Sequence, residues 1–319
     1  MITYPDFIAK KMLVVSSDQL RDLRFANENV VIEEDGKIIQ QVSLHTVFSI
    51  IVIGDCTITS RLIGELKKHG IILALLRQNF TVVEVLGGEM NGNTLLRELQ
   101  YRRDGDDLEI AKRIVENKIY SEQLIIDKIR EKTDIQKETI GQLAKLRASA
   151  RDATENDSLL GIEGSAAKAY FSTYFDGMDW LKRSPRTKFD VNNVLLDIGY
   201  TFLFHFIEAL LLLYGFDVYH GVYHKQFYAR KSLVCDIQEP FRCIVDEALR
   251  KAYNLGQISE KDFGHANGGY FILPPMVKKY TVIFFNAIIG NKEEMYAYVQ
   301  LYYRYIMDNT REFPKFVPK

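Results

Sequence analysis

The sequence predicts an α+β protein, with a small β-sandwich-like domain over residues 1–90 followed by a larger all-α domain over residues 91–319. Short β-branched runs bounded by turn residues dominate the first part. From Thr94 onward, apolar residues recur at helical spacing. A polar, glycine-rich linker, residues 87–93, separates the two parts. A length of 319 residues fits two domains of ordinary globular composition.

In the first part, six strands and one helix are expected. Asp35-Gly36 is a strong hairpin signal between two of the strands. The helix begins near Thr59 and ends at His69-Gly70, where the glycine caps its last turn. The expected strands are residues 12–16, 29–33, 38–43, 48–53, 71–76 and 81–86. Strands 48–53 and 71–76 are candidates for either the core or a dimer seam.

The second part is expected to be helical throughout. The charged stretch 132–157 is typical of a surface helix plus a loop. The most apolar stretch, 191–216, is interrupted by Asp197, His205 and Glu208, and a membrane span needs about 20 apolar residues. We therefore expect a buried core helix and no membrane partner. The later helices are expected at about 159–175, 191–214, 240–254, 276–289 and 293–308.

Net charge and cysteine content limit the kinds of binding surface and structural framework that the protein can have. The formal net charge is −1, so any DNA-binding surface must be a local patch. Cys56, Cys235 and Cys243 are an odd number without a C-x-x-C pair, which argues against a disulfide framework or a structural zinc site. They fit a reducing cytosol. The N-terminal residues do not have the pattern of a signal peptide, and we expect a cytoplasmic, prokaryotic protein.

Three segments place ionisable side chains among apolar or small residues. In the first, Glu163 lies between Gly161 and Gly164, where small neighbours leave room for a metal ion and a phosphate. A solvated glutamate near a helix N-terminus is the more common alternative. In the second, His220 and His224 flank Gly221 after the long apolar helix. Such a histidine pair is more often incidental than metal-binding unless acids join it.

The third segment supplies such acids. Asp236 and Glu239 are three residues apart and share a helical face, and Arg242 follows three residues later. The apolar flanks weaken the alternative of a plain surface helix. Carboxylates with one imidazole suit Mg²⁺ or Mn²⁺ better than structural zinc. Aromatic residues interleave with some of the nearby cations, as a frayed DNA end would need. These cations are Lys168, Lys182, Arg183, Arg186, Lys188, Lys225, Arg230, Lys231 and Arg242.

Taken in order over residues 159–250, these motifs resemble the CRISPR-associated integrases of the Cas1 family. The motifs are Gly161-Ile-Glu163-Gly164, Asn193 to Tyr200, Gly215-Phe-Asp217 running to His224, and Ser232 to Arg242. The β-then-α layout agrees along the whole chain. The combination is specific, although each motif alone is weak.

The resemblance implies catalytic metal ligands at Glu163, His224 and Glu239. His224 is preferred to His220 because it ends the G-x-x-H step that starts at Gly221. Asp236, Asn193 and His220 are secondary candidates. Pro240 departs from the family pattern and predicts a kink or helix start at Glu239, which leaves Asp236 open as the second acid. The DNA-binding candidates are Lys168, Arg186, Lys225, Arg230, Lys231 and Arg242.

The resemblance also implies a role in CRISPR adaptation, the spacer acquisition step of antiviral defence. Such proteins are homodimers joined through the β domain, and two dimers form a heterohexamer with a small second adaptation protein. They insert a short prespacer duplex into the CRISPR repeat by metal-dependent 3′-hydroxyl transesterification. Two alternatives remain open: a metal-dependent nuclease or phosphatase without integration, and a non-catalytic DNA-binding scaffold.

Overall fold

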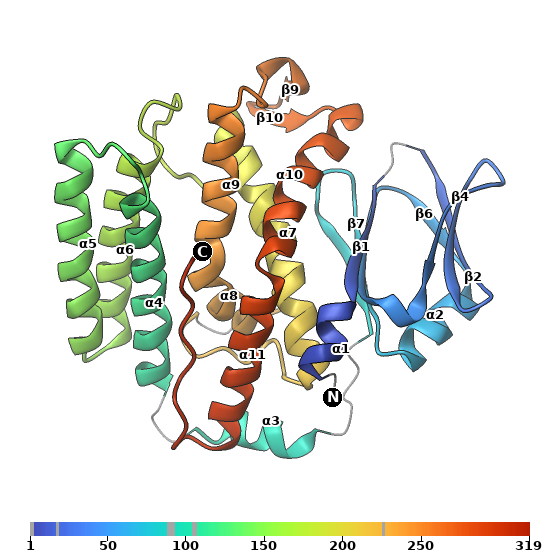
Figure 1. Ribbon diagram of the computed structural model, residues 1–319, viewed down its shortest axis with the longest axis horizontal. Helices are drawn as coiled ribbons and strands as arrows, with labels where there is room; N and C mark the ends of the chain where they lie inside the picture. Colours follow the sequence, from blue (N-terminus) through green and yellow to red (C-terminus); the bar gives the residue numbers. More distant parts are fainter. Residues whose placement is uncertain (1–2, 17–18, 88–92, 104–106, 225–226) are drawn as a thin grey trace.

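The computed structural model describes residues 3–16, 19–87, 93–103, 107–224 and 227–319. Its elements form an outer sheet, an inner sheet and a helical body, in that order across the molecule (Figure 1). Strands fill the N-terminal part and helices dominate the rest, so the predicted α+β class is confirmed. The predicted domain boundary at residue 90 lies outside the described residues and stays a prediction.

The inner sheet has the strand order β1-β5-β7-β8. Its first three strands are parallel, and β8 pairs antiparallel with β7. Every residue of β5 is buried, as expected for a strand covered on both faces. Residues 48–53 and 71–76 therefore belong to the core of this chain rather than to a dimer seam. The strands are β1 Lys11–Ser16, β5 Val47–Ile53, β7 Ile72–Leu76 and β8 Val82–Leu86.

The outer sheet has the order β4-β3-β2-β6. Leu13, Ile50 and Leu73 of the inner sheet pack in one apolar cluster with residues of the outer sheet and of α2, Ser60–Lys68. The strands are β2 Arg21–Ala26, β3 Asn29–Glu34, β4 Lys37–Ser43 and β6 Cys56–Ile58. Neither β2 nor β6 was predicted. β2 carries three charged residues and β6 has only three residues, so neither has a strong strand pattern.

Helices α4, α5 and α6 form one side of the helical body, with α7, α9, α10 and α11 beside them (Figure 1). The helices are α1 Tyr4–Ala9, α3 Thr94–Tyr101, α4 Asp107–Asp127, α5 Asp134–Asp152, α6 Asn156–Tyr174, α7 Val191–Tyr214, α8 Ser232–Gln238, α9 Arg242–Asn254, α10 Val277–Gly290 and α11 Lys292–Met307. Short 3-10 turns are η1 Leu44–Thr46, η2 Glu239–Phe241, η3 Glu260–Asp262 and η4 Pro274–Met276.

Helix α7 is the core helix that the sequence predicts. It is long and apolar enough to cross a membrane, but 83% of its most apolar window is buried inside the protein. Phe206 meets Phe48 of β5 edge-on, with ring centroids 5.6 Å apart, which joins the helical body to the inner sheet. Gly199 allows α9 to approach closely, because a Cβ there would lie 2.4 Å from Val245 Cγ1.

One element corrects the expectation of an all-α second part. Strands β9 Phe263–Ala266 and β10 Gly269–Ile272 form an antiparallel hairpin. Its turn is Asn267-Gly268, and both residues have positive φ angles. An Asn-Gly pair is itself a strong hairpin signal, so the sequence contained the information that the helical interpretation overlooked.

Candidate metal-binding active site

Two of the predicted ligands, Glu163 of α6 and Glu239 of η2, flank one buried ammonium group. Lys118 of α4 forms an ion pair with Glu163, and its Nζ lies 2.6 Å from Glu239 Oε2. All three side chains are largely buried, with Glu239 only 3% exposed. Three elements that are far apart in sequence therefore present two carboxylates to a single cation.

Charge balance explains how Lys118 and Glu239 stay ionised inside the protein. Burial alone lowers the pKa of Lys118, but the carboxylates of Glu163, Glu239 and Glu122 raise it well above its usual range. Burial alone raises the pKa of Glu239, but the charges of Arg242, Lys118 and His224 lower it below its usual value.

The backbone around Pro240 places Glu239 at a kink, as the sequence predicts. Helix α8 ends at Gln238, the 3-10 turn η2 contains Glu239, and α9 begins at Arg242. Glu239 keeps helical angles, φ −54° and ψ −47°, although a following proline disfavours them. Arg242 Nη1 donates to Glu239 Oε1 at 2.9 Å, so the carboxylate lies between two cations.

His224 is held by Asp236, which is fully buried. Asp236 accepts the backbone N–H groups of Val222, Tyr223 and His224 at 2.6, 3.2 and 2.9 Å. Its Oδ1 also lies 2.8 Å from His224 Nδ1. A proton on Nδ1 leaves the lone pair at Nε2 for a ligand. With these contacts, Asp236 is suited to position the imidazole rather than to bind a metal itself.

The loop that carries His224 is tied to both sides of the site. A Cβ at Gly221 would lie 2.6 Å from Asp236 Oδ2, so only glycine allows this close approach without a shift. The hydroxyl of Tyr223 donates to Glu163 Oε2. The loop therefore contacts α8 through Asp236 and α6 through Glu163, which sets the position of His224 between them.

The ligand atoms of Glu163, His224 and Glu239 do not all lie within metal-binding distance of one another. Within the part of the chain that the structure describes, the trio with mutual ligand-atom distances under 4.8 Å is Glu28, His45 and His69 instead. The Lys118 ammonium separates the two carboxylates of the predicted site. The donor types still fit a divalent cation, because two carboxylate groups already surround a positive charge and an oriented imidazole is adjacent.

Asn193 and His220, two secondary candidates, have other contacts. Asn193 Oδ1 accepts from Arg183 Nη1 and from the Ser184 backbone, both at 2.8 Å, and its Nδ2 donates to Lys182 O. It therefore organises the loop before α7. The His220 ring packs edge-on against Tyr101 of α3, with centroids 5.0 Å apart. These contacts of Asn193 and His220 are made with residues other than Lys118, Glu163 and Glu239.

The predicted DNA-binding residues divide into two groups. Lys168, Arg186 and Arg230 are exposed. Lys231 and Arg242 are partly buried and paired with Glu208 and Glu239, so their charges are largely compensated within the protein. Lys225 lies outside the described residues.

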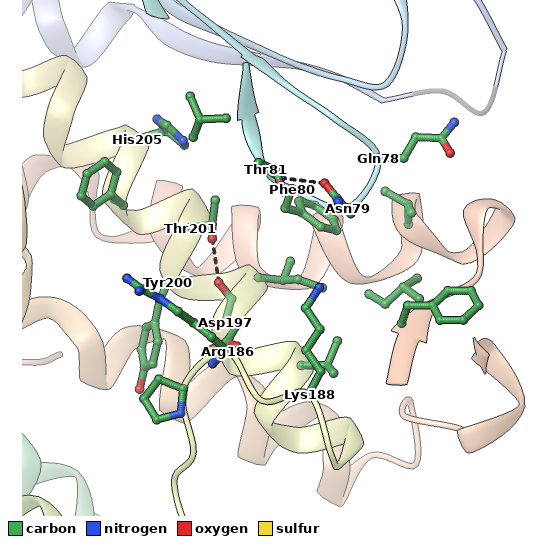
Figure 2. Close-up of a pocket in the computed structure, with 18 of the residues that line it drawn as sticks. Gln78, Asn79, Phe80, Thr81, Arg186, Lys188, Asp197, Tyr200, Thr201 and His205 are labelled. Atoms are coloured by element: carbon green, nitrogen blue, oxygen red, sulfur yellow. Dashed lines mark hydrogen bonds between the residues drawn. The ribbon is translucent and has the colours of Figure 1, made fainter. Parts of the chain in front are cut away.

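A cavity of about 880 Å³ adjoins this region, between the β7–β8 turn and α7 (Figure 2). Arg186 and Lys188 lie on one side of it, and Phe80 of the turn lies across from them. Arg242 and Tyr200 also line it, and the Arg242 guanidinium stacks 4.2 Å from the Tyr200 ring centroid. The cavity thus combines positive charge with aromatic surface, next to Glu239.

The sequence interpretation missed Lys118 and the buried acid Asp246. Tyr170 donates to Asp246 at 2.8 Å, and Tyr200 donates to its other oxygen. Lys118 did carry a signal: it falls at helical spacing between Val115 and Glu122 on the buried stripe of α4. A charge in such a stripe needs a buried partner. Asp246 carries the same kind of signal, since it falls at helical spacing between Cys243 and Leu249 on the buried face of α9.

Comparison with known proteins gives the family. The family model described as CRISPR associated protein Cas1 matches residues 13–285. The chain belongs to the Cas1 family. A curated relative of this Cas1 family member is "CRISPR-associated endonuclease Cas1 2" of Rhodospirillum rubrum, which is 31% identical over 81% of this chain and 80% of its own length.

Solved structures agree with the Cas1 fold. The chain matches a protein of a "Cas6-RT-Cas1--Cas2 complex" with a TM-score of 0.81 and 24% identity, over 95% of this chain and 35% of that longer one. It also matches a "Casposase bound to integration product" with a TM-score of 0.80 and 20% identity, over 95% of this chain and 92% of the casposase. Because both identities are below 25%, these two structures support the fold of the chain and nothing further.

Proposed function

We propose that this Cas1 family member is a metal-dependent DNA integrase of CRISPR adaptation. It would insert short prespacer duplexes into a repeat array by transesterification. One observation carries the proposal: the partly buried carboxylate of Glu163 and the buried carboxylate of Glu239 surround a single cation beside an imidazole held by a buried acid. The endonuclease name of the curated relative and the integration product of the casposase support the same class of DNA chemistry.

Glu163, His224 and Glu239 would hold Mg²⁺ or Mn²⁺. The bound ion would polarise a phosphodiester and stabilise the leaving oxygen. Asp236 acts as a positioning residue, since it accepts from Nδ1 and leaves Nε2 of His224 for the ligand role. Arg242 and Lys118 compensate the charge of Glu239, so that this acid remains ionised.

The proposed reaction exchanges one phosphodiester bond for another. The 3′-oxygen of the incoming duplex forms a bond to a phosphorus of the repeat, and the bond from that phosphorus to the repeat's own 3′-oxygen breaks. The attacking hydroxyl loses a proton and the leaving oxygen gains one. Because the number of phosphodiester bonds is unchanged, the joining step needs no separate energy source.

Exposed groups suggest how DNA would approach. Nothing lies within 4 Å of a Cβ built at Gly161 or Gly164, so α6 is open beside Glu163. Lys168 lies farther along the same helix and is exposed. We propose that a duplex end crosses this open surface. Arg186 and the aromatic-lined cavity of Figure 2 would then receive a frayed strand through charge and stacking.

The proposed partners are based on the predicted domains, residues 1–90 and 91–319. We propose a homodimer formed through the β-rich part, where strand β4 is an edge of the outer sheet and exposes Ile38 and Ile39. We further propose a heterohexamer with a small second adaptation protein; the solved "Cas6-RT-Cas1--Cas2 complex" supports association with such a partner. This protein would act in the prokaryotic cytoplasm and would serve antiviral defence.

A joining assay separates this proposal from a plain nuclease and from a DNA-binding scaffold. The full chain, with and without the small partner, is incubated with short duplex DNA and a supercoiled plasmid that carries a repeat. The reactions contain Mg²⁺, Mn²⁺ or a chelator. We expect metal-dependent joining that His224→Ala and Glu239→Ala abolish. His265→Ala, which changes an exposed histidine of β9, is the matched control and should join normally.

Each other outcome has a defined meaning. Cleavage without joined product would support the nuclease instead. Metal-independent DNA binding with neither product would support the scaffold. Joining that survives Glu239→Ala but not Asp236→Ala would move the second metal ligand to Asp236. Absence of joining by the folded protein with its partner and both metals would overturn the integrase proposal.

A further inference from the structure

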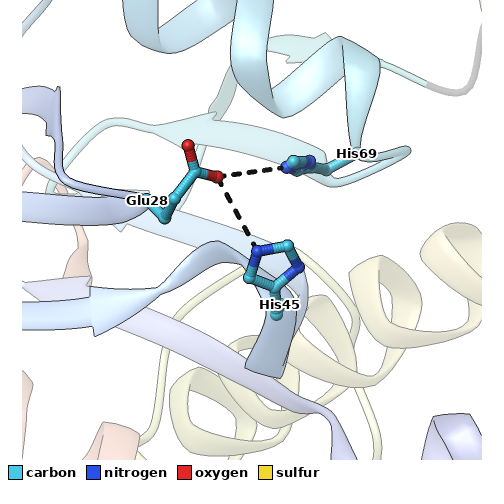
Figure 3. Close-up of side chains that lie close together, drawn as sticks. All are labelled: Glu28, His45 and His69. Carbon is cyan, nitrogen blue, oxygen red and sulfur yellow. Dashed lines mark ion pairs between the residues drawn. The ribbon is translucent and has the colours of Figure 1, made fainter.

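A second group of metal-ligating side chains lies in the N-terminal part, away from the elements that form the proposed active site. Glu28 comes from the turn between β2 and β3, His45 from η1 and His69 from the end of α2. Figure 3 shows one oxygen of the Glu28 carboxylate facing both imidazole rings. The ligand atoms of all three residues lie within 4.8 Å of one another.

Backbone contacts hold the three ligand-bearing segments in place. The Glu28 carbonyl oxygen accepts from the backbone N–H of Leu44 at 3.0 Å, which fixes the turn beside His45. Leu44 itself is fully buried. The backbone N–H of His69 donates to Glu65 O at 3.0 Å and caps α2. The convergence is thus built into the fold and does not depend on the side chains alone.

Direct contacts between the three side chains do not satisfy their hydrogen-bonding groups. Glu28 Oε2 lies 3.7 Å from His45 Nε2 and 3.9 Å from His69 Nε2, and both separations are too long for a hydrogen bond. Among the described residues, the buried Nε2 of His69 has no hydrogen-bond partner. A buried ring nitrogen without a partner loses its hydration, and a bound group that contacts it would recover that loss.

These separations suit a metal ion. Zinc–nitrogen and zinc–oxygen bonds of about 2.0–2.1 Å at tetrahedral angles place neighbouring ligand atoms about 3.3 Å apart. The two observed gaps exceed that spacing by only about half an ångström, which small side-chain rotations can close. Two imidazoles and one carboxylate are also the ligands of many three-residue zinc sites, in which water occupies the fourth position.

We propose that Glu28, His45 and His69 bind one Zn²⁺ ion that links the β2–β3 turn, η1 and the end of α2. The two imidazoles favour Zn²⁺ over the Mg²⁺ or Mn²⁺ of the proposed active site. Because Glu28 and His45 are well exposed, water reaches the fourth position. The ion stabilises the β-rich part, which is the part proposed to carry the dimer contact.

Zinc binding is measured on the full chain, purified in chelator and then dialysed. His224→Ala serves as the background, so that the imidazole of the proposed active site cannot contribute. We expect one Zn²⁺ per chain by calorimetry, and Co²⁺ should give the intense visible absorption of a tetrahedral site. Glu28→Gln, His45→Gln and His69→Gln should each weaken Zn²⁺ binding at least roughly tenfold. His265→Gln is the matched control and should bind as the background does.

Thermal melting gives a second readout. Zn²⁺ should raise the melting temperature of the background protein, and His45→Gln should remove that rise. In a chain that retains His224, His45→Gln should leave Mn²⁺-dependent joining intact, which separates this site from the proposed integrase function. Zn²⁺ affinity unchanged in His45→Gln and His69→Gln, or weakened equally in His265→Gln, would overturn the zinc site.

Discussion

At the residue scale, the decisive feature of the proposed active site is the Lys118 ammonium between two acids. The carboxylate of Glu239 is buried and that of Glu163 is partly buried, and the two would repel each other if the intervening positive charge were absent. The same geometry that accommodates an ammonium ion also attracts a divalent cation. Lys118 therefore holds the two carboxylates close together before a metal ion is bound.

Removing that charge is expected to destabilise the fold. Lys118→Met leaves two buried carboxylates without their shared partner, and breaking a buried ion pair costs about 3–5 kcal/mol. Urea denaturation at pH 7 in chelator measures the free energy of unfolding. Mn²⁺ should restore part of the loss. The control is Lys137→Met, which breaks an exposed pair with Asp134 and should change stability by less than about 0.5 kcal/mol. Equal stabilities of the two variants would contradict this role for Lys118.

At the element scale, the loop between α7 and α8 matters most, because it carries His224 across the surface of α8. Asp236 of α8 binds three successive backbone N–H groups of this loop. These three contacts fix the loop backbone more firmly than the single contact of the His224 ring with Asp236 could. The loop conformation therefore determines where the imidazole lies.

Gly221→Ala tests this dependence. The new Cβ would lie 2.6 Å from Asp236 Oδ2 and 2.8 Å from the backbone carbon of Ser232, so the loop must move. We expect joining to fall by roughly 100-fold, as for displaced catalytic groups, while circular dichroism stays unchanged. Gly141→Ala in α5 is the control, because its Cβ meets nothing within 4 Å. Normal joining by Gly221→Ala would show that the close approach is not required.

Asp246 connects α9 to α6 and α7 through Tyr170 and Tyr200. Burial raises the pKa of Asp246 to about 6, although the two tyrosine hydrogen bonds oppose the rise. The folded protein therefore retains this proton between about pH 4 and pH 6, where the unfolded chain has lost it. Its contribution to stability is complete below pH 4 and is lost as the pH rises through 6.

Asp246→Asn removes this titration. The free energy of unfolding of the variant minus that of the wild type should increase by up to about 3 kcal/mol between pH 4 and pH 7.5. Urea denaturation at both pH values measures the change, and any constant effect of the amide cancels. Asp176→Asn, at an exposed position, should show no such trend. A difference that is independent of pH would show that Asp246 is not protonated in the folded protein near pH 5.

At the scale of the whole molecule, local patterns predicted most of the architecture. β-branched runs located the inner-sheet strands, and a long apolar stretch located α7, because each element buries its own apolar residues. β2 and β6 escaped notice because their stability comes from pairing in the sheet rather than from their own composition. The hairpin at Asn267-Gly268 was missed because its short strands lie within a helical part of the chain.

The proposed site shows the same limit. Motif resemblance suggested Glu163, His224 and Glu239, and the structure adds what distant segments contribute: Lys118 from α4 and the backbone contacts of Asp236. Long-range pairs of this kind leave little pattern in a single sequence. The trio of Glu28, His45 and His69 was likewise not evident, because its members are spread over more than forty residues in separate turns.

The most direct test of the central claim is Mn²⁺ binding by electron paramagnetic resonance, which reads the metal site without requiring DNA or a partner protein. Mn²⁺ is titrated into the wild type, Glu163→Gln, Glu239→Gln and His224→Ala, with His45→Gln as the variant of the other metal group. The account predicts saturable binding by the wild type and by His45→Gln, and at least roughly tenfold weaker binding by the other three. Equal Mn²⁺ affinity in the wild type and in all three site variants would contradict it.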